Sequence, residues 1–318
     1  MYDTLILEEQ DSASAPLAVP LPASRTRFRY GFTIFCGAFL LFQVQLILGK
    51  YILPWFGGTP AVWTTCMLFF QLLLLGGYLY AHFLSSKLSA RAQAFAHIAV
   101  LSVSASLIVL GAVFWKTPLL PGPSWRPTSA DFPVSYILRL LLVAVGLPFL
   151  CLSASAPLLQ SWFVRAYPGK SPYRLYALSN IGSLLGLVTY PFAVEPGFRL
   201  HVQAWLWSGA YMLFFAGLIA CAIDIKRSAL PASPAAKSEE AVQPSSSVQL
   251  LWFLLPAFAS LMLLATTNLM CQEVAVVPFL WVLPLSLYLI SFIVCFDSPK
   301  WYRREIFHVL LAASLPLA

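Results

Sequence analysis

The feature that most constrains this chain is a series of long apolar stretches separated by short loops. A helix that crosses about 30 Å of hydrocarbon needs about 20 mostly apolar residues. Eight stretches meet this requirement, at residues 31–54, 60–84, 94–115, 134–163, 175–193, 201–223, 250–271 and 277–296. A ninth begins near Ile306 and is too short to cross before Ala318. We therefore expect eight complete spans and a truncated ninth, with the chain ending inside a helix.

Composition supports this interpretation. Hydrophobic residues make up 60% of the chain and charged residues only 10%, whereas soluble domains carry about 25% charged residues. A soluble protein of this size needs far more polar surface. The sequence therefore predicts an all-α, polytopic transmembrane helix bundle whose main partner is the lipid bilayer.

The apolar stretches divide the chain into four parts. Residues 1–29 lack the apolar core of a signal peptide and are expected to form a disordered cytosolic tail. Residues 30–224 would form a six-helix membrane region, and 225–248, rich in Ala, Pro, Ser and Glu, a flexible cytosolic linker. Residues 249–318 would add two further spans and a truncated third. A linker after the sixth helix matches the layout of major-facilitator transporters, which is an analogy of layout alone.

The distribution of basic residues predicts the orientation in the membrane. Cytoplasmic loops are enriched in Lys and Arg. Of the 19 such residues, 14 lie in one set of alternate loops and four in the other, while Arg139 lies inside a span. We therefore expect a cytoplasmic N-terminus and a multi-pass protein of the inner (plasma) membrane. The net charge of +7 is then a topology signal, and no nucleic-acid partner is expected.

A glycine-containing run, NIGSLLG at 180–186, has the spacing of a phosphate-binding loop. Such a loop needs a strand before it and a βαβ unit around it, whereas here an uninterrupted apolar run follows Arg174. Ser179, Gly182, Ser183 and Gly186 share one helical face. Small residues on one face let a neighbouring helix approach closely in lipid, so the pattern predicts helix packing.

Several polar residues interrupt the apolar runs. Asn180 lies beside the glycine face and needs a polar partner or a water-lined cavity. Glu195 is interpreted either as a solvated loop carboxylate or as a carboxylate at a cavity mouth that binds a cation. Arg139 either extends to the outer membrane interface or faces the bundle interior, where Glu195 or Glu273 would be its partner.

The remaining polar residues of the spans have two interpretations. Each forms an interhelical hydrogen bond, or together they line a polar cavity for a small solute; the set is Gln43, Gln45, Gln71, Asn268, Gln272 and Glu273. His82 and His97 flank a cytosolic loop, so an interfacial position is expected. The six cysteines form no paired motif, and we expect neither a metal site nor a cofactor.

Three stretches together resemble one protein family. They are LPWFGGTPAVWTTCMLFFQLLLLGGYLYAH at 53–82, YALSNIGSLLGLVTYPFAVEP at 176–196 and TTNLMCQEVAVVPFLWVLPLSLYLISFIVCF at 266–296. In this order they resemble the membrane half of bacterial fused major-facilitator/spermidine-synthase-like proteins, and the resemblance covers residues 30–318.

The resemblance implies a role but no catalytic residue here. In that family a cytosolic domain similar to polyamine aminopropyltransferases follows the membrane region and would use decarboxylated S-adenosylmethionine and a putrescine-type amine. This chain contains no strand–GxGxxG–helix pattern. The implied function is therefore a membrane domain that anchors or supplies a synthase-like domain beyond residue 318. The alternative is a transporter-like protein for a small cationic or amphipathic solute, such as a polyamine.

Overall fold

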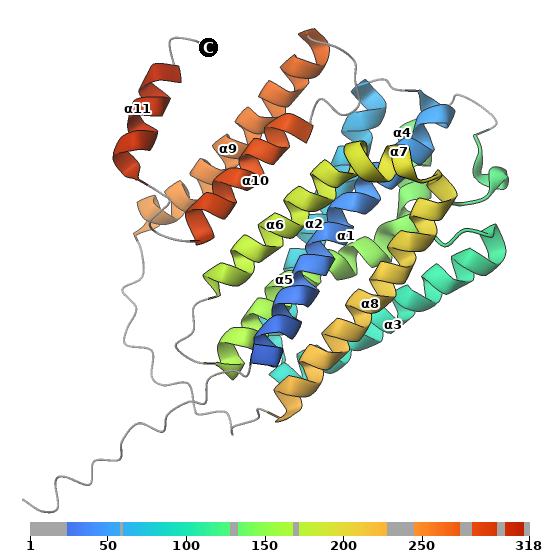
Figure 1. The fold of residues 1–318 in the computed structure, drawn as a ribbon, viewed down its shortest axis with the longest axis horizontal. Helices are drawn as coiled ribbons and strands as arrows, with labels where there is room; N and C mark the ends of the chain where they lie inside the picture. The colour runs from blue at the N-terminus through green and yellow to red at the C-terminus, as the bar shows by residue number, and fades with distance from the viewer. Residues whose placement is uncertain are drawn as a thin grey trace, which may run out of the picture.

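The computed structural model describes residues 24–57, 60–127, 133–167, 172–227, 245–273, 282–297 and 303–314. These residues form helices, and no strand occurs among them, so the predicted all-α class is confirmed (Figure 1). The first three helices are α1 (Ser24–Phe56), α2 (Pro60–Lys87) and α3 (Ala90–Trp115), and a single 3₁₀ turn, η1 (Pro123–Trp125), follows them.

Two of the later spans contain a π-helical turn. Helices α4 (Pro133–Leu141) and α5 (Leu147–Ala166) are joined by η2 (Leu142–Gly146), and α6 (Tyr173–Thr189) continues through η3 (Tyr190–Val194) into the short α7 (Glu195–Gly197). Proline cannot donate the backbone hydrogen bond of an α-helix. Pro148 is the second residue after the first π turn and Pro191 lies in the second, which suits the wider hydrogen-bonding of a π turn.

The last helices are α8 (Leu200–Arg227), α9 (Ser246–Glu273), α10 (Val282–Asp297) and α11 (Arg304–Ser314). Among the described residues, seven helices are long and apolar enough to cross a membrane, and α10 is a shorter apolar helix. A multi-pass helical architecture is thereby confirmed. Three expected features lie outside the described residues. They are the start of the eighth span, most of the linker and the end of the ninth apolar segment.

One boundary differs from expectation. The first helix begins at Ser24, inside the segment expected to be a disordered tail, and residues 1–23 lie outside the described part of the chain. The extra turns carry Arg29, whose guanidinium lies 3.1 Å from the Asp224 carboxylate of α8. Because Asp224 pairs with Arg29, the charged first turns are stabilised, which explains why α1 begins before the apolar run.

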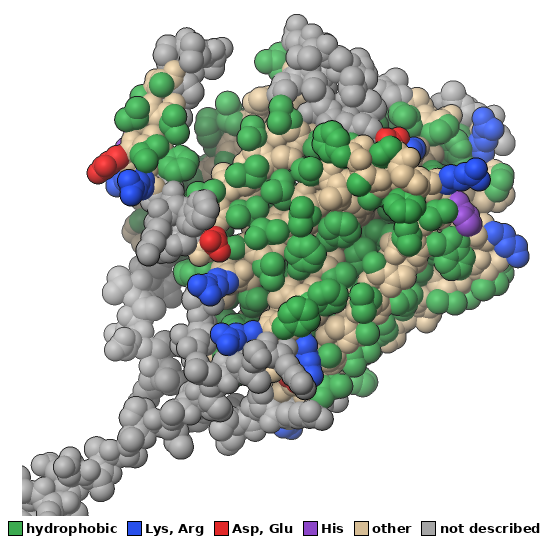
Figure 2. Space-filling view, viewed as in Figure 1, with side chains coloured by type: hydrophobic (Ala, Val, Ile, Leu, Met, Phe, Trp, Pro, Cys, Tyr) green, Lys and Arg blue, Asp and Glu red, His purple; other side chains and the backbone are tan. Residues whose placement is uncertain are grey.

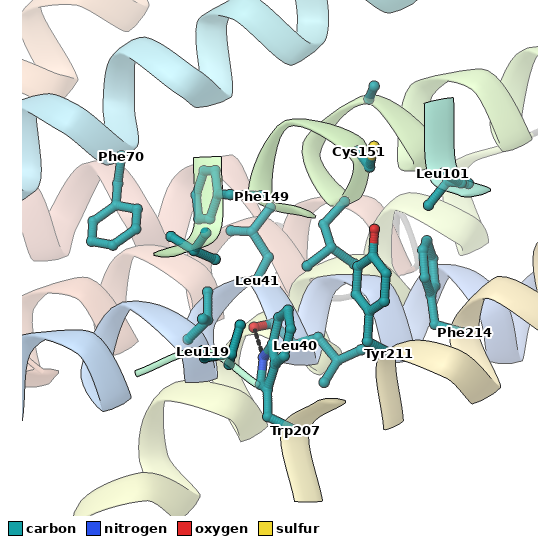
Figure 3. Close-up of a cluster of buried hydrophobic side chains, with 14 of the residues drawn as sticks. Leu40, Leu41, Phe70, Leu101, Leu119, Phe149, Cys151, Trp207, Tyr211 and Phe214 are labelled. Atoms are coloured by element: carbon teal, nitrogen blue, oxygen red, sulfur yellow. Dashed lines mark hydrogen bonds between the residues drawn. The ribbon is translucent and has the colours of Figure 1, made fainter. Parts of the chain in front are cut away.

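Helix α1 runs through the middle of the bundle, with α6 and α8 beside it, while α10 packs on α6 (Figure 1). The core is filled with aromatic and branched side chains, including Phe70, Phe149 and Tyr211 (Figure 3). The indole Nε1 of Trp207 donates a 2.8 Å hydrogen bond to the backbone oxygen of Leu40. The interior of the six-helix region is therefore packed with side chains at this depth.

The outer surface of the bundle carries many exposed apolar side chains. Phe95, Phe114 and Phe192 are each at least 75% exposed, and Figure 2 shows hydrophobic side chains spread along the bundle, with Lys and Arg side chains gathered near its ends. Large exposed apolar surfaces mark sites of contact with a membrane or with another protein. The arrangement fits a bundle that is surrounded by lipid along its length and by water at its ends.

Candidate functional site

The glycine face of α6 lies against α1. A Cβ atom on Gly182 would lie 2.5 Å from the backbone oxygen of Phe35, and one on Gly186 would lie 2.6 Å from that of Phe39. Both distances are shorter than any ordinary carbon–oxygen contact. The two backbones therefore approach so closely that a side chain at either position would force them apart.

We call this contact between α1 and the glycine face of α6 the glycine seam, or α1–α6 seam. Two polar side chains beside it, Gln43 and Asn180, form hydrogen bonds. The buried Gln43 side chain donates from Nε2 to the backbone oxygen of Gly186 at 2.7 Å and to Oγ1 of Thr189 at 3.1 Å. Asn180 donates from Nδ2 to the backbone oxygen of Tyr176 at 2.9 Å, within its own helix. Gln43 thus joins α1 to α6, and Asn180 needs no partner from another helix.

At one end of the seam, α1 is joined to α7 by an ion pair. The Lys50 Nζ atom lies 2.7 Å from Oε1 of Glu195, and each side chain is about one-third exposed, at 34% and 32%. The expected alternatives for Glu195 were a solvated carboxylate or a cation-binding one. In the structure its cation is the ammonium group of Lys50, and Arg139 is not its partner.

A buried glutamine holds the turn that leads to Glu195. The Tyr190 hydroxyl donates to Oε1 of Gln203 at 3.1 Å, while Nε2 of Gln203 donates to the backbone oxygens of Val194 at 3.3 Å and Phe198 at 2.8 Å. Val194 is the last residue of the π turn, and its oxygen also accepts from the backbone N–H of Phe198, which follows α7. Gln203 therefore fixes the exit of the span and, with it, the position of Glu195.

The second ion pair, Arg29–Asp224, joins α1 to α8 at the opposite end of the bundle. The two cationic members, Arg29 and Lys50, are 21 positions apart on one helix. At about 1.5 Å per residue this is about 32 Å, close to the hydrocarbon thickness of a bilayer. The two ion pairs therefore lie where charged side chains would contact water, one on each side of the hydrocarbon layer.

A buried polar cluster connects α2, α3 and α5. The Ser155 hydroxyl donates to the backbone oxygen of Cys151 at 2.6 Å, so it can only accept from His97, whose Nε2 lies 2.9 Å away. His97 therefore carries its proton on Nε2, and its Nδ1 atom is a buried acceptor without a partner among the described residues. The Tyr80 hydroxyl is likewise buried and unpartnered, and the two rings lie 5.7 Å apart.

This finding corrects the expectation for His97. The sequence interpretation placed it at the membrane interface because it follows a cytosolic loop, but the side chain is fully buried inside the bundle. His82, by contrast, is exposed. The difference arises because His97 lies on the face of α3 that also carries Gln93 and Leu101, both buried. One sequence does not show which face of an apolar helix meets its neighbours.

Arg139 lines a surface pocket and does not face the bundle interior. The pocket has a volume of about 220 Å³ and is formed by Trp125, Tyr136 and Arg139. The Tyr136 hydroxyl donates to the backbone oxygen of Trp125 at 2.6 Å, and the Tyr136 ring lies 6.0 Å from that of Phe56. Arg139 is exposed, as expected for the interpretation in which it extends to the interface.

The other candidate residues are not gathered around one cavity. Gln71 is exposed on the outer face of α2, whereas Asn268, Gln272 and Glu273 belong to the last turns of α9 and their side chains lie outside the described residues. A second, shallow hollow of about 500 Å³ on α3 and α8 is mostly apolar and contains none of the predicted residues. The described part of the chain therefore does not assemble the expected polar cavity.

Two of the three stretches that carry the family resemblance pack against each other, through α6 and α10. The Tyr176 ring lies 5.8 Å from that of Phe296, stacked at 28°. We call Tyr176, Tyr288, Phe292 and Phe296 the tyrosine cluster; its ring contacts join α6 and α10.

No protein-family model, curated protein or solved structure matches this chain.

Proposed function

We propose that this chain is the membrane domain of a spermidine-synthase-like fused protein, and that it anchors or supplies an aminopropyltransferase-like domain. The observation that supports the proposal is the tyrosine cluster. Two stretches that are far apart in the sequence, and that were singled out by resemblance alone, each contribute to one contact region on the bundle.

The position of the cluster fits an anchoring role. Tyr176 lies in the first turn of α6 and Phe296 in the last turn of α10. Arg165 in the last turn of α5, Arg174 in the first turn of α6 and Lys170 between the two helices make this connection basic, and basic connections are cytoplasmic under the positive-inside rule. A synthase-like domain on the cytoplasmic side would lie next to this end of the bundle.

The gene itself supplies the direct test. We expect the reading frame to continue past the codon for Ala318 into a strand, a glycine-rich nucleotide loop and a helix. Membranes from cells that express the whole frame should then form spermidine from putrescine and decarboxylated S-adenosylmethionine. The proposal is contradicted if the reading frame contains no such domain and no neighbouring gene encodes a separate synthase-like partner.

The proposal includes an inner-membrane location with the N-terminus in the cytoplasm. Reporter fusions after residues 87 and 170 should then be active as cytoplasmic reporters, and a fusion in the loop that contains Lys116 should be active outside. The reverse pattern would place the tyrosine cluster on the wrong side for a cytoplasmic domain.

A transporter-like role for a small cationic or amphipathic solute is the second candidate, and the buried His97–Tyr80 cluster is the observation that favours it. Ionisable residues inside a membrane bundle are costly and commonly line ion or solute paths. Uptake of labelled putrescine into proteoliposomes should fall strongly in His97→Gln and remain unchanged in His82→Gln, since His82 is exposed. Equal uptake by protein-free liposomes would exclude this role for putrescine.

A further inference from the structure

We infer that the pocket of Trp125, Tyr136 and Arg139 binds a phosphate group, with the phosphodiester of a membrane lipid as its source. The pocket volume of about 220 Å³ is several times the roughly 30 Å³ that one water molecule occupies in the liquid. It therefore has room for a tetrahedral oxyanion together with part of the group attached to it.

No acidic side chain among the described residues forms an ion pair with Arg139. Among the described residues, the acidic side chains that form ion pairs are Asp224 and Glu195, and their partners are Arg29 and Lys50. Within this part of the chain, the guanidinium group of Arg139 has no ion-pair partner. Its planar set of donors matches two oxygens of a phosphate or carboxylate at once.

The depth of the pocket favours a lipid as the source of the phosphate. Arg139 lies six residues, or about 9 Å, into the span that begins at Pro133. Aromatic residues surround this level: the Trp115 and Trp125 rings are 6.4 Å apart, and those of Tyr51 and Trp55 are 4.7 Å apart. Such aromatic belts lie at the headgroup level of a bilayer, where lipid phosphates are concentrated.

The two aromatic side chains also shape the pocket. The hydrogen bond from Tyr136 to the backbone of Trp125 fixes the loop against the first turn of α4. Their rings offer apolar walls for the glycerol and upper acyl carbons, while Arg139 offers the charge. This combination suits an amphipathic headgroup better than a fully hydrated ion.

Native mass spectrometry of the full chain in detergent tests the inference. The probes are phosphatidylglycerol, a galactosyl diacylglycerol that lacks phosphate, and inorganic phosphate. We expect wild type to retain phosphatidylglycerol and not the galactolipid. Retention should be about tenfold weaker in Arg139→Gln, as expected for loss of one charge-assisted contact, and intermediate in Arg139→Lys.

Arg126→Gln is the matched control, because Arg126 is exposed beside Trp125 but does not line the pocket; it should retain lipid like wild type. Arg139-dependent binding of inorganic phosphate without retention of phosphatidylglycerol would assign the pocket to the free anion. Equal retention of both lipids by wild type would overturn the inference even if Arg139→Gln fails to fold. Equal retention of phosphatidylglycerol by Arg139→Gln and wild type would overturn it as well.

Discussion

The Lys50 ammonium group lies 2.7 Å from the Glu195 carboxylate, across 145 positions of sequence, and it closes one end of the α1–α6 seam. Both side chains are about one-third exposed, so solvent screens their attraction. We expect Glu195→Gln to lower the free energy of unfolding by at most about 1 kcal/mol. The loss should shrink at high salt, measured by thermal unfolding in detergent.

The exchanged pair Lys50→Glu with Glu195→Lys provides the control. It should be closer to wild type than either single exchange, because it restores opposite charges at the same positions. A much larger loss in Glu195→Gln that is insensitive to salt would mean that the carboxylate is held by more than Lys50.

The glycine seam should tolerate no side chain. Gly182→Ala and Gly186→Ala would each place a Cβ atom against an α1 carbonyl oxygen, and we expect a loss of about 1–3 kcal/mol each from overpacking. Gly209→Ala is the matched control in α8, because a Cβ atom there would meet nothing within 4 Å. Melting temperatures of the three variants check this; equal values would show that α1 can move away at no cost.

Two glutamines of neighbouring spans should differ in their importance. Gln43→Leu removes hydrogen bonds to Gly186 and Thr189, and interhelical bonds of this kind contribute on average about 0.6 kcal/mol. Gln71→Leu replaces an exposed polar side chain on the outer face of α2 and should leave stability unchanged or raise it in lipid. Unfolding in detergent with added lipid measures both; a greater loss in Gln71→Leu would point to an unseen partner of that residue.

The tautomer of His97 gives a fourth prediction. Ser155→Ala removes the acceptor of the Nε2 proton and should cost about 1–3 kcal/mol, because it leaves a buried donor unpaired. Tyr80→Phe removes a hydroxyl that has no partner among the described residues and should cost nothing. A loss in Tyr80→Phe as large as in Ser155→Ala would instead reveal a bridging group, such as a water molecule, between Tyr80 and His97.

The sequence predicted the helices well and their contacts poorly. The spans follow from the length of the apolar runs, and α2 was expected at 60–84 and found at Pro60–Lys87. The glycine face of α6 was also recognisable, because small residues at helical spacing have one common use in lipid. The π turns were not expected.

The predicted site was less accessible to sequence reasoning. Every face of a membrane helix can be apolar, so the exposed Gln71 and the buried His97 look alike in one sequence. The partner of Glu195 was missed for a related reason: Lys50 stands at the far end of α1, and nothing local to either residue indicates the pair.

The ion pair between Arg29 and Asp224 has a consequence for biosynthesis. Its members are 195 positions apart, and ribosomes add about 5–20 residues per second, so the first helix is made roughly 10–40 s before its last partner. During most of that interval the Gln43 side chain lacks its partners, because Gly186 and Thr189 follow it by 143 and 146 positions. Insertion factors that shield a nascent polar helix would therefore matter most for the segment that is synthesised first.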